Sequence, residues 1–289
     1  MLHVTNGDSA VEVLSKAGVQ GEFLPWRDVL HEGPVDASLP LETLSLLRAG
    51  FIAQAGWGDK DLVQRQFAER DATLRAAGGH DEVVLWFEHD LYDQLQLIQL
   101  LAWFEENPHP RLTLVCEPEY LGIMAPEHAA ALFQARRRVG EQQLRAGLAA
   151  WKAFGSADPS LLQRLDTKTL KFLPAALRRL MQEYPWTGVG LSRLEQEVVD
   201  ALEFSALKFR EIFRAIQERE DPMYLADTVA HWHLERMERE GLLAHEGEEW
   251  TLVQMHKSNI EPRWIGGVRV DGSCPWRWDP GSARLVALA

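Results

Sequence analysis

Residues 83–106 read VVLWFEHDLYDQLQLIQLLAWFEE, and this stretch decides the fold class. Val83–Phe87 is a continuous apolar run of strand length, which is typical of a strand buried on both faces. Leu91–Glu106 is apolar nearly all round, so it is expected to form a deeply buried helix. A buried strand that leads into a buried helix predicts a parallel sheet with crossover helices.

Three further short apolar runs have helical patterns between them, as a parallel sheet requires. The predicted strands are Leu2–Thr5, Glu22–Leu24 and Leu112–Cys116, and the predicted helices are Ala10–Ala17, Leu41–Gln54 and Asp61–Ala77. We therefore expect a Rossmann-like α/β domain over residues 1–125.

The strand pattern stops near Ala125, and residues 126–190 predict a helical connector that includes Arg136–Phe154 and Leu170–Tyr184. A new unit begins at Ser192 and Glu195, whose spacing is that of a capping box at a helix start. From there the pattern predicts three helices and a small hairpin, the order of a winged helix. These elements are Arg193–Phe204, Phe209–Glu220, Leu225–Glu240, Leu242–His245 and Trp250–Val253. We expect a winged-helix-like domain over residues 191–289 with a further β-hairpin at its end.

The charge of the chain disfavours nucleic acid as a partner. Its 289 residues carry a formal net charge of −13, which repels polyanions. Residues 191–253 hold seven basic residues against fifteen acidic ones, so this winged-helix-like unit is a poor DNA binder by itself. A protein contact or a homo-oligomer remains open for it.

Cysteine usage and hydropathy predict a cytoplasmic protein with no membrane partner. Cys116 and Cys274 are far apart and form no CxxC pair, which argues against a disulfide framework. The start, MLHVTNGDSA, has neither the basic nor the apolar region of a signal peptide, and no apolar run approaches the length of a membrane span.

Ionisable and amide side chains follow the predicted strands, where an open parallel sheet binds its ligands. We predict acid/base catalysis by His31, His89, Glu88 and Asp8, because imidazole titrates near neutrality and carboxyl groups bias its charge. We expect Asn6, Gly7, Ser9, Arg27, Glu32 and Gln94 to contact the ligand. His89, Asp90 and Asp93 offer ligands for a divalent metal, although their spacing matches no fixed metal motif.

Each of these segments also has a purely structural interpretation. Asp90 can cap the helix that starts at Leu91, and residues 6–9 can be an ordinary turn between a strand and a helix. Residues 31–34 can be a polar loop with a Gly-Pro turn. Convergence of these segments on one edge of the sheet is what favours a functional site.

Three motifs resemble a bacterial family catalogued only as a domain of unknown function, number eighteen thirty-five. They are LHVTNGDSA, LPWRDVLHEGPV and VLWFEHDLYDQLQLIQLL. The likeness covers roughly residues 1–125, and the stretches FLPAALRRLMQEYPWTGVGLSRLEQ, RWIGGVRV and PWRWD extend it over most of the chain. The matching positions are Asn6, Gly7, Asp8, Arg27, His31, Glu32, Gly33, Glu88, His89, Asp90, Asp93 and Gln94. The resemblance implies the domain layout and the importance of these motifs, but names no reaction.

The sequence predicts an enzyme that hydrolyses or transfers a phosphoester of a small phosphorylated or nucleotide-like ligand, with a divalent metal as an open question. The alternative is a non-enzymatic sensor whose winged-helix-like unit contacts a protein or DNA. A third reading is a structural module whose sheet edge is filled by side chains.

Overall fold

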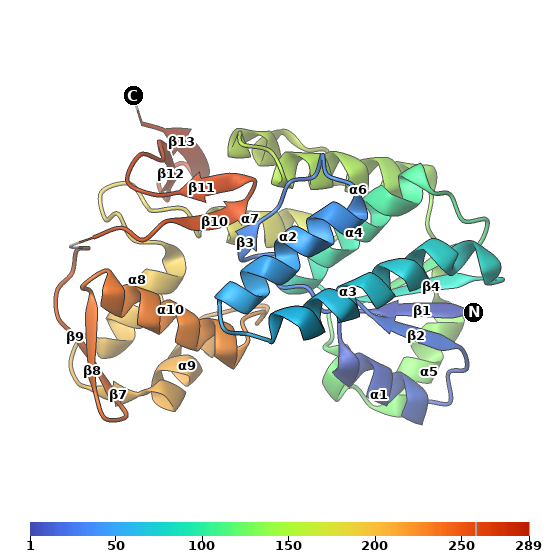
Figure 1. Cartoon of the computed structure of the whole chain (residues 1–289), viewed down its shortest axis with the longest axis horizontal. Coiled ribbons are helices and arrows are strands. Elements are labelled where there is room, and N and C mark those ends of the chain that lie inside the picture. Colours follow the sequence, from blue (N-terminus) through green and yellow to red (C-terminus); the bar gives the residue numbers. More distant parts are fainter. Residues whose placement is uncertain (258, 289) are drawn as a thin grey trace.

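A computed structural model describes residues 1–257 and 259–288 and has a mixed α/β fold built on a five-stranded, mostly parallel sheet (Figure 1). The strand order is β2-β1-β4-β5-β6, and only β6 runs antiparallel to its neighbour. The bounds are β1 Leu2–Thr5, β2 Glu22–Pro25, β4 Val83–Phe87, β5 Leu112–Cys116 and β6 Arg137–Arg138. The four predicted parallel strands are confirmed.

Both faces of the sheet are covered by other elements, and alternate side chains of a strand pack into the core on either face. In β4, Val84 and Trp86 pack with helices α1 (Asp8–Lys16) and α5 (Pro126–Ala135). Val83, Leu85 and Phe87 point to the opposite face, into the main core. All five residues are buried, which explains why β4 reads as an unbroken apolar run.

Helix α4 (Leu91–Glu106) fills the centre of the main core, as its all-round apolar pattern predicted. Two helices of the connector, α6 (Glu141–Phe154) and α7 (Leu173–Met181), pack against it. Short 3-10 turns complete this half, at Ala76–Gly79, Leu121–Ile123 and Pro159–Arg164. No helix within the described residues combines the length and apolarity that crossing a membrane needs.

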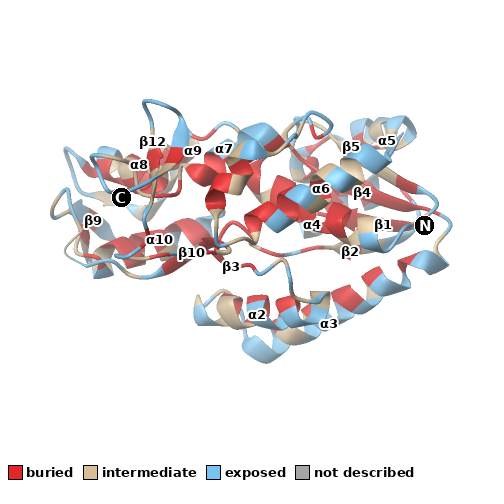
Figure 2. Cartoon of the chain, turned by 90° about the horizontal axis from the view of Figure 1, so that it is seen from above, coloured by how far each residue is buried: buried red, intermediate tan, exposed pale blue. Residues whose placement is uncertain are grey.

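Helices α2 (Leu41–Gln54) and α3 (Lys60–Arg75) form an antiparallel hairpin that makes a layer of its own (Figure 2). The hairpin has a small core of Ala49, Ile52, Val63 and Phe67. Leu44 from α2 and Leu74 from α3 join it to the main core, and α3 contacts β2. This arrangement leaves the inner side of α3 facing the ends of the strands.

The C-terminal unit contains α8, β7, α9, α10, β8 and β9 in chain order, around a separate core. Its bounds are Arg193–Leu202, Leu207–Lys208, Phe209–Gln217, Asp227–Arg239, Leu243–Glu246 and Glu249–Leu252. Its three strands form one sheet in the order β7-β9-β8. The capping box is confirmed, since Ser192 and Glu195 each accept a backbone hydrogen bond from the other.

The last strands return to the main core instead of extending the C-terminal unit. Strands β10 (Arg263–Gly266) and β11 (Val268–Val270) form one antiparallel pair, and β12 (Trp276–Asp279) and β13 (Arg284–Ala287) form another. β10 also pairs with β3 (Gly33–Pro34) near the start of the chain. Ile265, Val268 and Leu285 belong to the same buried cluster as β1 and β4.

The predicted helix over Arg136–Phe154 is wrong in its first turn. Residues 137–138 form β6 at the sheet edge, and α6 begins only at Glu141. Arg136 is not a solvated helix residue, because its guanidinium donates to both oxygens of the buried Glu82 carboxylate at 2.7 and 3.0 Å. The ion pair with Glu82 holds Arg136 at the sheet edge, where residues 137–138 continue as an extended strand.

Candidate functional site

The strand order places β1 and β4 side by side at the point where the chain changes direction across the sheet. An open parallel sheet binds ligands in the crevice outside the carboxyl ends of such strands. Asn6 follows β1 and Glu88 follows β4 directly. A cavity of about 780 Å³ opens there, between the sheet, the α2–α3 hairpin and the C-terminal unit, and its size suits a small organic ligand.

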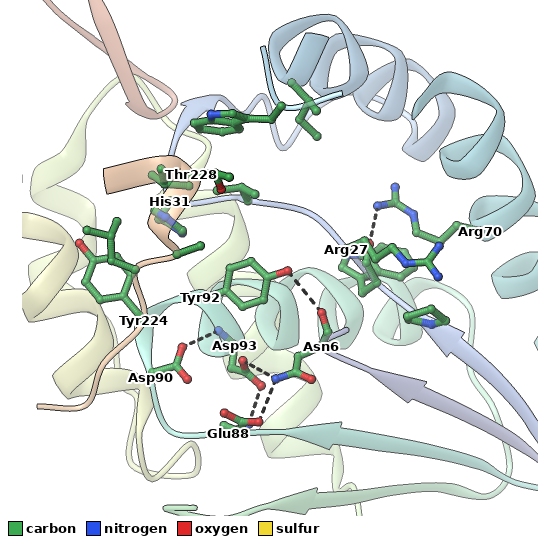
Figure 3. A pocket seen from close by; sticks show the side chains of 18 of the residues that line it. Asn6, Arg27, His31, Arg70, Glu88, Asp90, Tyr92, Asp93, Tyr224 and Thr228 are labelled. Atoms are coloured by element: carbon green, nitrogen blue, oxygen red, sulfur yellow. Dashed lines mark hydrogen bonds between the residues drawn. The ribbon is translucent and has the colours of Figure 1, made fainter. Parts of the chain in front are cut away.

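Three acidic residues, Glu88, Asp90 and Asp93, form a buried cluster at the bottom of this cavity; we call it the acidic triad (Figure 3). One carboxylate oxygen from each lies within 4.8 Å of the others. Asp90 caps α4, because its Oδ1 accepts a hydrogen bond of 3.1 Å from Asp93 N. The predicted cap is therefore real, and the same turn brings the other two carboxyl groups together.

Neutral donors orient the acidic triad. Asn6 Nδ2 donates to Glu88 Oε1 and to Asp93 Oδ2, both at 3.0 Å. Two backbone amides add hydrogen bonds of 2.7 Å, from Leu121 N to Glu88 Oε1 and from Glu88 N to Asp93 Oδ1. No Lys, Arg or His within the described part of the chain lies within ion-pair distance of these carboxyl groups.

Burial and mutual repulsion raise the pKa of each acidic residue in the triad. Burial, helped by the charge of Asp90, raises the pKa of Glu88 to about 7. Burial raises the pKa of Asp90 to about 6. Burial and the charges of Asp90 and Glu88 raise the pKa of Asp93 well above its usual range. The triad thus holds protons near neutral pH unless a cation compensates its charge.

His31 lines the same cavity and is 4% exposed. Neither of its ring nitrogens has a hydrogen-bond partner within residues 1–257 and 259–288. Burial lowers the pKa of His31 to about 4, so its ring is neutral at physiological pH and offers one donor and one acceptor. Its ring lies edge-on to Tyr92 and Tyr224, at centroid distances of 6.0 and 5.1 Å.

Aromatic side chains separate His31 from the acidic triad. Tyr92 lies between them in Figure 3, and its hydroxyl donates to the Asn6 carbonyl at 3.3 Å. Tyr120 also lines the cavity, and its hydroxyl donates to Met223 O at 3.1 Å. This second contact links the loop after β5 to the segment that precedes α10.

The inner side of α3 forms the far end of the cavity. Val63, Phe67 and Arg70 recur at helical spacing and line it, together with Trp57 from the turn before α3. The guanidinium of Arg70 is already occupied, because it donates to Asp71, Trp26 O and Ser45. From the C-terminal unit, Leu225, Thr228 and Val229 complete this end.

Of the residues predicted from the sequence, the structure brings six together around the cavity. They are Asn6, Arg27, His31, Glu88, Asp90 and Asp93. Arg27 has a φ of 46°, a left-handed conformation that residues other than glycine seldom adopt and that often marks a functional loop. Its exposed guanidinium forms an ion pair of 2.5 Å with Asp8.

The other predicted residues do not line the cavity. Asp8 is engaged by Arg27 at the surface, and Ser9 packs beside Gly122. Gly7 has extended backbone with a φ of −178° and starts α1 without a side-chain cap.

His89, Glu32 and Gln94 point into protein contacts instead. His89 packs against the rings of Tyr120 and Phe172, at centroid distances of 5.4 and 5.8 Å. Glu32 accepts a hydrogen bond of 2.7 Å from His233 Nε2. Gln94 donates to the Glu88 carbonyl at 2.6 Å, so it holds the turn that carries the triad.

Sequence reasoning missed most of the cavity wall. Tyr92 stands within the quoted motif, and its position one residue before Asp93 was a usable signal. Trp57, Phe67 and Tyr224 carried no such signal, because they reach the cavity only through packing of distant segments.

Comparison of the chain with protein-family models, with curated proteins and with solved structures gave no match. The family resemblance of the three motifs stays a prediction. The functional argument therefore depends on the geometry of the cavity.

Proposed function

We propose that the cavity is the active site of an enzyme that hydrolyses or transfers a phosphoester of a small phosphorylated, nucleotide-like ligand, with a divalent cation held by the acidic triad. The observation that carries this proposal is the cluster of three buried carboxyl groups, which has no cationic side chain at ion-pair distance among the residues that the structure describes. Buried charges are costly unless they are paired or coordinate a metal.

The donor set fits a hard divalent cation. Glu88, Asp90 and Asp93 supply carboxylate oxygens, which Mg²⁺ and Mn²⁺ prefer, and none of the described residues that line the cavity carries a thiol. A bound cation would supply charge to attract a phosphate group to an otherwise acidic site. Asn6 would keep Glu88 and Asp93 oriented toward it, since a metal site depends on the groups that hold its ligands.

Proton exchange and cation binding are linked at the acidic triad. Glu88, whose pKa is about 7 without a cation, holds a proton near neutral pH that a bound cation would displace. His31 is neutral and has no hydrogen-bond partner within residues 1–257 and 259–288, so its role in this proposal is to hydrogen-bond the ligand rather than to act as a strong base. The surface residue Asp8 and the packed residue His89 have no direct part in it.

We extend the proposal to the finer fold assignments. The parallel order β2-β1-β4-β5 supports a Rossmann-like α/β domain. The order α8, β7, α9, α10, β8, β9 supports a winged-helix-like unit.

The test is turnover of a panel of phosphomonoesters and phosphodiesters with Mg²⁺ or Mn²⁺. Asp90→Asn removes a charge but keeps a good helix cap, so it should fold normally and lower kcat/KM by about a hundredfold or more. Glu117→Gln, which removes a carboxylate outside the cavity after β5, is the matched control and should change nothing. Equal activity of Asp90→Asn and the wild type would refute the proposal.

A second candidate function is a ligand sensor, which one observation favours. Tyr224, Leu225 and Thr228 from the C-terminal unit line the same cavity as the acidic triad, so a ligand would contact both halves of the chain. A DNA-binding version is disfavoured, because α10 buries His233 and Arg236 instead of presenting them. Ligand-dependent binding of a protein partner by the wild type that is lost in Asp90→Asn, without any turnover by the wild type, would favour the sensor.

A further inference from the structure

Part of the cavity wall is apolar and aromatic, and we call this part the aromatic end. It consists of Ile52, Trp57, Val63, Phe67, Leu225 and Val229. Trp57 is held by edge-on contacts with Phe51 and Trp232, at centroid distances of 5.5 and 5.6 Å. The ring is thereby fixed between the α2–α3 hairpin and α10.

The aromatic end contains one unpaired hydrogen-bond donor. Trp57 Nε1 is buried and has no hydrogen-bond acceptor in the described part of the chain. A buried indole N–H usually finds a partner, because leaving it unpaired costs its desolvation energy. A hydrocarbon ligand would leave this cost uncompensated, whereas a heteroaromatic ring with a carbonyl or ring-nitrogen acceptor would remove it.

A second unpaired group, His31, lines the same cavity. His31 is nearly fully buried, neither of its ring nitrogens has a hydrogen-bond partner among the described residues, and Figure 3 places it between Thr228 and Tyr92. A neutral imidazole both donates and accepts, which matches a hydroxyl group. The cavity therefore combines an aromatic surface and an indole donor with an imidazole that both donates and accepts, and with a cluster of carboxyl groups.

We propose that the ligand is a nucleoside phosphate, whose base lies in the aromatic end and accepts a hydrogen bond from Trp57, whose sugar hydroxyl meets His31, and whose phosphate meets the cation at the acidic triad. This inference rests on the proposed function for the phosphate end only. The cavity of about 780 Å³ is far larger than a phosphate ion and a cation require.

The test compares binding of five probes to the full chain by calorimetry in the presence of Mn²⁺: the four nucleoside 5′-monophosphates and ribose 5-phosphate. We expect at least one nucleotide to bind at least about tenfold more tightly than ribose 5-phosphate. Equal binding of all five probes would overturn the inference.

The Trp57→Phe variant isolates the indole N–H, because it keeps an aromatic ring against Phe51 and Trp232. We expect roughly a three- to tenfold loss of nucleotide affinity, the effect of one neutral hydrogen bond, with no change for ribose 5-phosphate. Trp103→Phe is the matched control, since Trp103 lies outside the cavity on α4. An equal loss in both variants, or in neither, would contradict the assignment of Trp57.

The outcomes separate this inference from the proposed function. If the chain prefers nucleotides but neither depends on Mn²⁺ nor turns any of them over, base binding at the aromatic end would be supported. The proposed phosphoester chemistry would then be refuted. Turnover of p-nitrophenyl phosphate that needs Asp90, together with no preference for nucleotides, would refute only the inference drawn here.

Discussion

Asn6, at the end of β1, donates a hydrogen bond of 3.0 Å to Glu88, at the end of the neighbouring strand β4. The same amide group also donates to Asp93 at 3.0 Å. One neutral side chain thus holds two carboxyl groups that repel each other. This relationship ties the first motif of the chain to the one that decides its fold.

Replacing Asn6 with Asp should turn this arrangement into four clustered carboxyl groups. The cluster would lose its donor and gain a charge, so we expect the metal-free variant to be less stable by about 2 kcal/mol. Mn²⁺ should restore most of that loss, because it compensates the added charge. Thermal unfolding with and without Mn²⁺ measures both effects, and a variant insensitive to the cation would speak against a metal site.

The acidic triad should make the metal-free protein less stable as the pH rises. The folded pKa values of Glu88 and Asp90 are raised to about 7 and 6, so the folded chain holds protons that the unfolded chain releases above about pH 4. The contribution of Glu88 and Asp90 to the free energy of unfolding is therefore fully present below about pH 4, and it is lost progressively as the pH rises to about 7.

Urea unfolding at several pH values checks this slope, and Glu88→Gln is the informative variant. It keeps the shape of the side chain but cannot ionise, so its stability should fall less between pH 4 and pH 7 than that of the wild type. Parallel curves for both proteins would show that Glu88 does not titrate as proposed.

Much of the fold could be predicted from the sequence, because it is encoded locally. The four parallel strands and helices α2 and α4 follow from periodicity and from the lengths of apolar runs. The edge strand β6 could not be predicted, since two consecutive arginines resemble a helix surface until Glu82 is known to face Arg136. β3 is equally hidden, because its partner β10 lies far along the chain.

The site was predictable in part for the same reason. Strand ends can be read from the sequence, so Asn6, Glu88, Asp90 and Asp93 were found. The direction in which a loop side chain points depends on its tertiary neighbours. His89 was therefore indistinguishable from His31, although one packs against Tyr120 and the other lines the cavity.

Asp8 illustrates this limit, and it leads to a prediction that departs from the sequence-based expectation. Asp8 is paired with Arg27 at an exposed position, and exposed ion pairs contribute at most about 1 kcal/mol. Asp8→Ala should therefore change stability and kcat/KM only slightly, by about twofold for the latter. If Asp8→Ala lowered kcat/KM as much as Asp90→Asn does, Asp8 would be a catalytic residue after all.

The contact between Glu32 and His233 should stabilise the position of the C-terminal unit beside the cavity. Arg236 donates to His233 Nδ1 at 3.1 Å, so the His233 proton lies on Nε2 and is donated to Glu32. Burial alone would raise the pKa of Glu32, but His233 and the charge of Arg263 outweigh burial and lower it to about 2. The stabilisation is therefore present above about pH 4.5 and is lost as the pH falls toward 2.

His233→Ala would leave Glu32 buried without its partner, and we expect a loss of about 3 kcal/mol at neutral pH. The double variant with Glu32→Gln should recover part of this loss, because it removes the uncompensated charge. Urea unfolding of the two single variants and the double variant measures the coupling. Additive losses would show that the two side chains do not interact.

The most direct test of the cation site is the number of protons released when Mn²⁺ binds. Metal binding to carboxyl groups with raised pKa values must displace their protons. Calorimetry in buffers of different ionisation enthalpy should show saturable binding with net proton release that decreases from about pH 6 to pH 8, and a smaller release from Glu88→Gln. Absence of saturable binding, or binding with the same proton release in the wild type and Glu88→Gln, would contradict a cation site at Glu88, Asp90 and Asp93.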